Sequence, residues 1–127
     1  MSADVVAELA QRFFDAIERG DIDAVGACYA DDAVIWHNTD GLESSKAENL
    51  ETLANFVQAI PVRRYEDRRL LVTADSFVQQ HALRCPRADG SIRELTAAIV
   101  CQVKDGQITR LDEYFDSAQL AAWRRAS

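Results

Sequence analysis

The spacing of apolar residues changes at Pro61, and this change constrains the fold more than any other feature of the sequence. Before Pro61 they recur every three or four residues, as at Val5, Leu9, Phe13 and Ile17, which predicts helices with one buried face. After Pro61 they alternate with polar residues, which predicts strands. Helices followed by a run of strands indicate an α+β domain.

Capping residues set the expected boundaries in the first half of the chain. Gly20 ends the first helix, and Asp21 caps a second helix that runs through Tyr29. A strand is expected at 33–36, and a third helix begins behind Ser45.

The second half of the chain is divided by turns such as Lys104-Asp105-Gly106, which favour β-hairpins. The expected strands span 62–73, 77–85, 92–103 and 107–115, and Asp116 caps a last short helix. The 127 residues suffice for one domain, spanning 1–127. We expect a curved antiparallel sheet with three helices on its concave face, forming a cone-shaped, half-open barrel with a pocket inside.

Net charge and cysteine content limit the classes of partner and the cellular location that are expected. The net charge of −7 disfavours nucleic acid and membrane surfaces as partners. Cys28, Cys85 and Cys101 are odd in number and lack CxxC spacing, so we expect no disulfide framework and a cytoplasmic location. No signal peptide or membrane span is evident in the sequence.

Two basic pairs interrupt this acidic chain, at 63–64 and 68–69. We expect these arginines at solvated strand positions, partnered by Glu66, Asp67 and nearby acids. An anion-binding or dimer-edge patch is the alternative.

The polar run Trp36-His37-Asn38-Thr39-Asp40 directly follows a strand that is expected to be buried. Buried polar groups cost about 1–3 kcal/mol each unless they find partners. This run is therefore either a satisfied network or the lining of a pocket. Asp40 precedes a glycine, where aspartate is common in turns, so a turn role is favoured over a pocket role for this residue.

His37 and His81 are the only histidines, and both fall in expected strands. A histidine titrates near neutrality and suits proton transfer. The alternative for His81 is a core histidine bonded to Gln79 or to the backbone. Glu113 alternates in phase with apolar neighbours, so it is a pocket carboxylate, a core partner or an edge residue.

The chain resembles the nuclear transport factor 2-like superfamily, which includes SnoaL-like polyketide cyclases, ketosteroid isomerases and limonene epoxide hydrolases. The resemblance spans almost the whole chain and rests on the segments Arg19-Gly20-Asp21-Ile22-Asp23, Tyr29-Ala30-Asp31-Asp32-Ala33, Asp105-Gly106-Gln107-Ile108 and Tyr114-Phe115-Asp116. It implies a cystatin-like α+β roll, a small-molecule pocket and a homodimer formed through the sheet. It identifies the fold better than the reaction.

The resemblance to ketosteroid isomerases places Phe13, His37 and Val100 at the positions of the tyrosine, the base and the protonated aspartate. The oxyanion donors of that family are therefore absent, which disfavours steroid isomerisation by that mechanism.

The resemblance to limonene epoxide hydrolases aligns Trp36 and Asn38 with the pair that holds the attacking water, and Glu113 with a catalytic carboxylate. The arginine and the second aspartate of that family fall near His81 and Leu83, so the relay is broken. The isomerase alignment points His37 into the pocket, whereas the hydrolase alignment points Trp36 and Asn38 there.

Together these features predict a small-molecule enzyme that performs isomerisation, cyclisation, hydration or epoxide opening on a small, oxygenated, hydrophobic substrate. No cofactor or metal is expected. The expected catalytic residues are His37, His81 and Glu113, and the expected substrate contacts are Phe13, Trp36, Asn38, Asp40, Phe56 and Leu111. A non-catalytic binding protein and a dimeric interaction domain are the alternatives.

Overall fold

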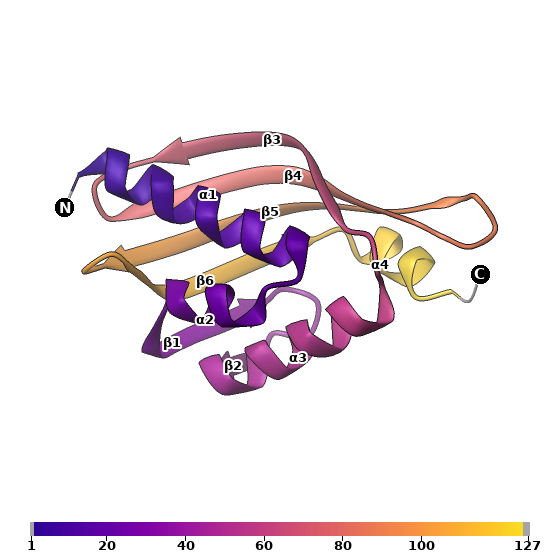
Figure 1. The fold of residues 1–127 in the computed structure, drawn as a ribbon, viewed down its shortest axis with the longest axis horizontal. Coiled ribbons are helices and arrows are strands. Elements are labelled where there is room, and N and C mark those ends of the chain that lie inside the picture. Colours follow the sequence, from indigo (N-terminus) through magenta and orange to yellow (C-terminus); the bar gives the residue numbers. More distant parts are fainter. Residues whose placement is uncertain (1, 126–127) are drawn as a thin grey trace.

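The computed structural model describes residues 2–125 and confirms the α+β class (Figure 1). Its elements, in chain order, are α1 (Ala3–Arg19), α2 (Ile22–Cys28), β1 (Tyr29–His37), β2 (Glu43–Ser45), α3 (Lys46–Ala59), β3 (Arg64–Val72), β4 (Ser76–Pro86), β5 (Ile92–Lys104), β6 (Gln107–Phe115) and α4 (Ser117–Trp123). The short strand β2 was not expected, and β1 begins at Tyr29, four residues before the expected start at Ala33.

The strands form one six-stranded sheet with the order β2-β1-β6-β5-β4-β3. Neighbouring strands are antiparallel except β1 and β6, which pair in parallel, so the sheet is mixed. Figure 1 shows α1, α2 and α3 on one face of the sheet and α4 beside one end of it. This is the expected curved sheet with three helices on its concave side.

Helix α1 ends where the sequence predicts, because Gly20 adopts the left-handed conformation with φ of 77°. A Cβ at this position would lie 2.9 Å from Cγ1 of Val57 and 3.0 Å from Nη2 of Arg63. Glycine is therefore required here both by the backbone and by close packing.

The main hydrophobic core lies between the helices and the sheet, where Phe13, Phe14 and Tyr29 are among its largest fully buried side chains. Val5 was expected on the buried face of α1, but its side chain is 42% exposed and Val6 is buried instead. A second cluster of Leu83, Cys85, Leu95 and Ile60 lies apart from this core. Leu120 and Trp123 of α4 pack against it.

Arg63 corrects the expectation of a solvated strand position, because its side chain is buried. The guanidinium donates to backbone carbonyl oxygens of Ile17 and Glu18 at 3.1 Å each, and of Val57 at 3.3 Å. It also donates to the Ile60 carbonyl. The carbonyls at a helix C-terminus lack partners within the helix, and one arginine satisfies them at the ends of both α1 and α3.

The observed partners of Arg68 also differ from the expected ones. Its guanidinium contacts Asp15 at 3.0 Å and Glu18 at 3.1 Å, both on α1, whereas Glu66 and Asp67 pair with Arg84. Among the described residues, no helix is long and apolar enough to cross a membrane.

Candidate functional site

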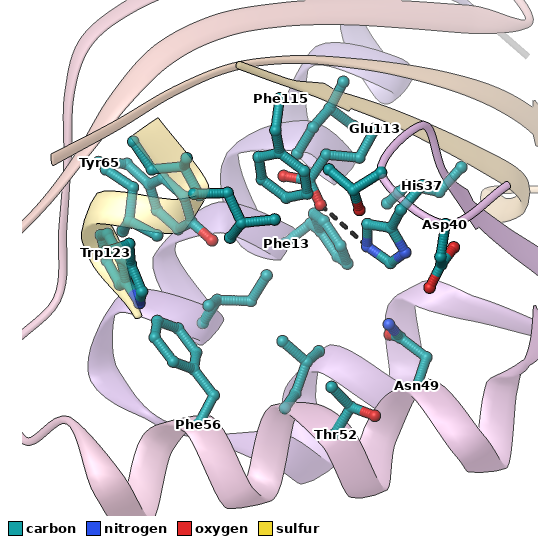
Figure 2. Close-up of a pocket in the computed structure, with 18 of the residues that line it drawn as sticks. Phe13, His37, Asp40, Asn49, Thr52, Phe56, Tyr65, Glu113, Phe115 and Trp123 are labelled. Carbon is teal, nitrogen blue, oxygen red and sulfur yellow. Dashed lines mark ion pairs between the residues drawn. The ribbon is translucent and has the colours of Figure 1, made fainter. Parts of the chain in front are cut away.

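A cavity of about 430 Å³ lies where the two hydrophobic clusters meet, between α3, the concave face of the sheet and α4. Its wall is mainly apolar. His37, Asp40, Asn49 and Glu113 gather near the end of β1, whereas Tyr65 lies across the cavity beside Trp123, as Figure 2 shows. Cavities of this size and polarity are typical small-molecule sites.

His37 and Glu113 face each other on the cavity wall (Figure 2). They are direct partners in the parallel ladder of β1 and β6, so their side chains project from the same face of neighbouring strands. Nε2 of His37 lies 3.2 Å from Oε1 of Glu113. Their side chains are 27% and 16% exposed, so both can contact a bound molecule.

The hydrogen bond with Glu113 raises the pKa of His37 above its usual value, although burial opposes this shift. The negative charges of Glu113 and Asp40 add to the increase in pKa. The imidazole also stacks on the Phe115 ring, with centroids 5.8 Å apart and an interplanar angle of 4°. These contacts fix the orientation of the imidazole at the cavity.

Four of the side chains expected to contact the substrate lie on the cavity wall, namely Phe13, Asp40, Phe56 and Leu111. Asp40 also has the expected turn role, because its Oδ1 accepts a hydrogen bond from the Leu42 amide at 2.9 Å.

Trp36 and Asn38 were expected to contact the substrate, but the structure places neither on the cavity wall. Alternation along β1 turns Trp36 to the outer face of the sheet, where its ring meets Tyr114 at a centroid distance of 5.3 Å. Tyr114 is 46% exposed on this face. The Asn38 amide instead ties β1 to β6 through two hydrogen bonds with the Phe115 backbone, at 2.9 and 3.2 Å.

His37 is thus the residue that β1 directs into the cavity, which is the orientation of the isomerase alignment. That alignment also uses Val100, but the inward residue of β5 at this point is its neighbour Ile99. Phe13 and Ile99 are both apolar, so these two positions supply no hydrogen-bond donor.

His81 was expected to be catalytic, but it lies in the core and does not line the cavity. Its Nδ1 lies 2.9 Å from the Gln79 amide nitrogen, as in the core-histidine alternative. The rings of Tyr65 and Phe14 pack against it at centroid distances of 4.6 and 5.5 Å. Burial lowers the pKa of His81 to about 4, and the positive charge of Arg68 adds to this effect.

Several polar residues of the cavity wall are absent from the expected site, among them Asn49 on α3 and Tyr65 on β3. Asn49 is buried, and its Oδ1 accepts a hydrogen bond from the Tyr29 hydroxyl at 2.8 Å. The available signal was a polar residue on the apolar side of an amphipathic helix. Tyr65 is held between Phe14 and His81 and gave no comparable signal, because the basic residues around it predicted a solvated strand.

Two histidines and a carboxylate can form a metal site, but His81 does not share the cavity with His37 and Glu113. Within residues 2–125, no group of three or more His, Cys, Asp or Glu side chains is placed to hold a metal ion.

The comparisons with known proteins agree with this fold. The model of the SnoaL-like domain family matches residues 10–111, and the chain therefore belongs to this family, within the nuclear transport factor 2-like superfamily. No curated protein sequence matches the chain.

Three solved structures are similar over most of their length. A candidate polyketide cyclase from Xanthomonas campestris pv. campestris has a TM-score of 0.81 at 22% identity, with 95% of this chain and 97% of that chain covered. An NTF2-like protein of unknown function from Burkholderia pseudomallei K96243 has a TM-score of 0.79 at 18% identity, with 99% of this chain and 100% of that chain covered. A candidate ketosteroid isomerase from Kribbella flavida has a TM-score of 0.73 at 19% identity, with 90% of this chain and 79% of that chain covered. Identities this low establish the shared fold and not a shared reaction.

Proposed function

We propose that this SnoaL-like protein is a cofactor-independent enzyme that moves a proton within a small, oxygenated, mostly apolar molecule. His37 acts as the base, and Glu113 orients its ring and stabilises its charged form. The observation that carries the proposal is the contact of 3.2 Å between Nε2 of His37 and Oε1 of Glu113 on the wall of a mainly apolar cavity.

The contact with Glu113 selects the tautomer of His37. A carboxylate accepts hydrogen bonds, so it favours the neutral imidazole that carries its hydrogen on Nε2. Nδ1 then keeps a lone pair, and no hydrogen bond within residues 2–125 occupies this atom of His37. Nδ1 can therefore accept a proton from a bound molecule, and Glu113 stabilises the imidazolium that forms.

The walls of the cavity define the substrate class. Phe13, Phe56, Leu111 and Trp123 surround the space in front of the base. A compact hydrophobic body is expected to fill this space, with its oxygen function at the polar end near His37. The first candidates are cyclic ketones and polyketide-like carbonyl compounds, whose C–H bonds beside the carbonyl are acidic enough for a positioned base. The candidate functions of the Xanthomonas and Kribbella proteins agree with this class.

The second candidate is a binding protein that uses the same cavity without catalysis. The apolar pair Phe13 and Ile99 favours it, because these side chains cannot stabilise a developing negative charge. The two candidates differ in whether His37 removes a proton from the bound molecule.

Proton transfer can be measured without knowing the physiological substrate. The protein is incubated in D₂O with cyclic ketones, enones and β-diketones, and NMR follows the exchange of protons next to the carbonyl. We expect His37→Gln to reduce the catalysed exchange about 100-fold or more, because it removes the base. Glu113→Gln should reduce it less, since the amide oxygen of the new side chain can still accept the Nε2 hydrogen.

Trp36→Phe is the matched control, because it changes the neighbouring position of β1 on the opposite face and keeps an aromatic ring against Tyr114. Its exchange rate should equal that of the unaltered protein. If these carbonyl compounds bind, as judged by thermal shift, but their protons exchange no faster than in buffer, the protein is a binding protein and not an enzyme.

A further inference from the structure

The hydrogen bond between Tyr29 and Asn49 lies directly behind the polar end of the cavity. The Tyr29 side chain is 1% exposed and Asn49 is 7% exposed, yet both residues line the cavity. Figure 2 shows the Asn49 amide reaching from α3 toward the imidazole of His37. A buried amide beside a candidate base raises the question of which amide atom faces the cavity.

The hydroxyl group of Tyr29 sets the orientation of the Asn49 amide. Burial raises the pKa of Tyr29 well above its usual value, so the hydroxyl keeps its hydrogen and must donate it to some acceptor. Oδ1 of Asn49, at 2.8 Å, is the acceptor that the described residues provide. If the amide were reversed, two donors would meet and the Tyr29 hydrogen would lose its partner.

The carboxylates around the cavity favour the same orientation. Glu113 and Asp40 lie on the wall near His37, and Figure 2 shows Asp40 beside the imidazole. An amide nitrogen is attracted to this negative region, whereas an amide oxygen is repelled. No hydrogen bond within residues 2–125 engages Nδ2 of Asn49, and Figure 2 shows this nitrogen on the side of the amide that faces the imidazole of His37.

We infer that Asn49 is a catalytic residue which donates a hydrogen bond from Nδ2 to a carbonyl oxygen of the substrate, and that Tyr29 positions its amide. The inference rests on the proposed function and narrows it: the substrate is a carbonyl compound with a hydrogen on the neighbouring carbon. A donor on the carbonyl and a base for the neighbouring C–H bond are the two groups that enolate formation requires.

The reaction step is balanced within the cavity. Nδ1 of His37 takes the proton, the electrons of the broken C–H bond form the carbon–carbon double bond, and the carbonyl π electrons move to the oxygen. Asn49 stabilises this oxygen as its negative charge grows, and Glu113 stabilises the imidazolium. Return of the proton from His37 to a different carbon completes an isomerisation. For a cyclisation, the enolate carbon attacks a second carbonyl group of the same molecule, the π electrons of that group move to its oxygen, and this oxygen takes the proton from His37.

The carbonyl contact can be observed separately from proton transfer. The probe is 2-cyclohexenone labelled with ¹³C at the carbonyl, and the measurement is the infrared carbonyl stretch of the bound molecule. A donated hydrogen bond lowers this frequency. We expect a lowered frequency in the unaltered protein and in His37→Gln, and its loss in Asn49→Leu.

Asn55→Leu is the matched control, because it makes the same change at an exposed position of the same helix. It should keep both the frequency shift and the exchange rate, whereas Asn49→Leu should slow proton exchange about 100-fold. Tyr29→Phe keeps the ring and releases the amide, so it should weaken both signals and provides a second variant if Asn49→Leu fails to fold.

The possible outcomes separate the two claims. An unchanged frequency shift and exchange rate in Asn49→Leu would overturn the role of Asn49 and leave His37 as the base. A shift that depends on Asn49, without any proton exchange, would overturn the proposed function and keep Asn49 as a binding donor. The absence of any bound carbonyl band in the unaltered protein would overturn the assignment to carbonyl substrates.

Discussion

The two histidines of this chain lie in opposite environments. His37 is partly exposed and paired with a carboxylate, which raises its pKa, whereas His81 is buried among aromatic rings, which lowers its pKa to about 4. The sequence predicted that each lies on a strand but could not separate their roles. Glu113 was the recognisable partner, and only the parallel register of β1 and β6 reveals that it faces His37 and not His81.

The buried His81 should make the protein less stable in mild acid. Its folded-state pKa lies below the unfolded value of 6.5, so the unfolded chain binds the proton first as the pH falls. The stability is present above pH 6.5 and is lost progressively toward pH 4. We expect the loss by pH 5 to be about 2 kcal/mol, measured by urea unfolding of the protein and of His81→Asn.

His37→Asn should change this pH dependence in the opposite direction. The pKa of His37 is raised on folding, so its contribution is present in mild acid and is lost as the pH rises through the folded-state pKa. If the free energy of unfolding depended on pH in the same way in the unaltered protein and in both variants, the opposite pKa shifts of the two histidines would be contradicted.

Helix and strand positions were largely predictable, because capping residues and periodicity act locally. The capping box at Ser45 and the left-handed turn at Gly20 are both present where expected. Strand β2 was missed because three residues are too few to show alternation. The burial of Arg63 was missed because two of its carbonyl partners, Ile17 and Glu18, lie 46 and 45 residues away on α1, which no local pattern encodes.

Arg63 should therefore contribute more to stability than its exposed neighbour. We expect Arg63→Met to lower the free energy of unfolding by about 3 kcal/mol or more, since it leaves buried carbonyl groups without donors. Arg64→Met should change it by less than about 0.5 kcal/mol, because Arg64 is exposed. Similar losses in chemical denaturation of the two variants would show that Arg63 does not join the two helices.

The cavity as a whole followed from the fold, but its chemistry did not. Curvature of the sheet over three helices predicted a pocket, and the apolar residues Phe13, Phe56 and Leu111 line it as expected. The face of β1 could not be predicted, because polar residues occur on both of its sides. The role of the Asn49 amide depends on a contact with Tyr29 across 20 residues of sequence, so it required the structure.

We also propose that two copies pair through the outer face of the sheet. Val78, Ala98 and Val100 form a half-exposed apolar strip there, and the nearby Arg84 and Arg110 are already neutralised by carboxylates of the same chain. Sedimentation equilibrium should show a dimer that Val100→Glu dissociates. Gln58→Glu adds the same charge at an exposed site on α3 and should leave the dimer intact; a monomer at all concentrations would contradict the pairing.

The most direct test is an NMR titration of the two imidazole rings, which follows their ¹³C–¹H signals from pH 3 to pH 9. We predict that one ring titrates above pH 6.5, assigned to His37, and one near pH 4, assigned to His81. Glu113→Gln should lower the first value and leave the second unchanged. If His37 titrates at or below pH 6.5, or if its pKa does not change in Glu113→Gln, then Glu113 does not stabilise the imidazolium. The proposed pairing of His37 with Glu113 would then be wrong.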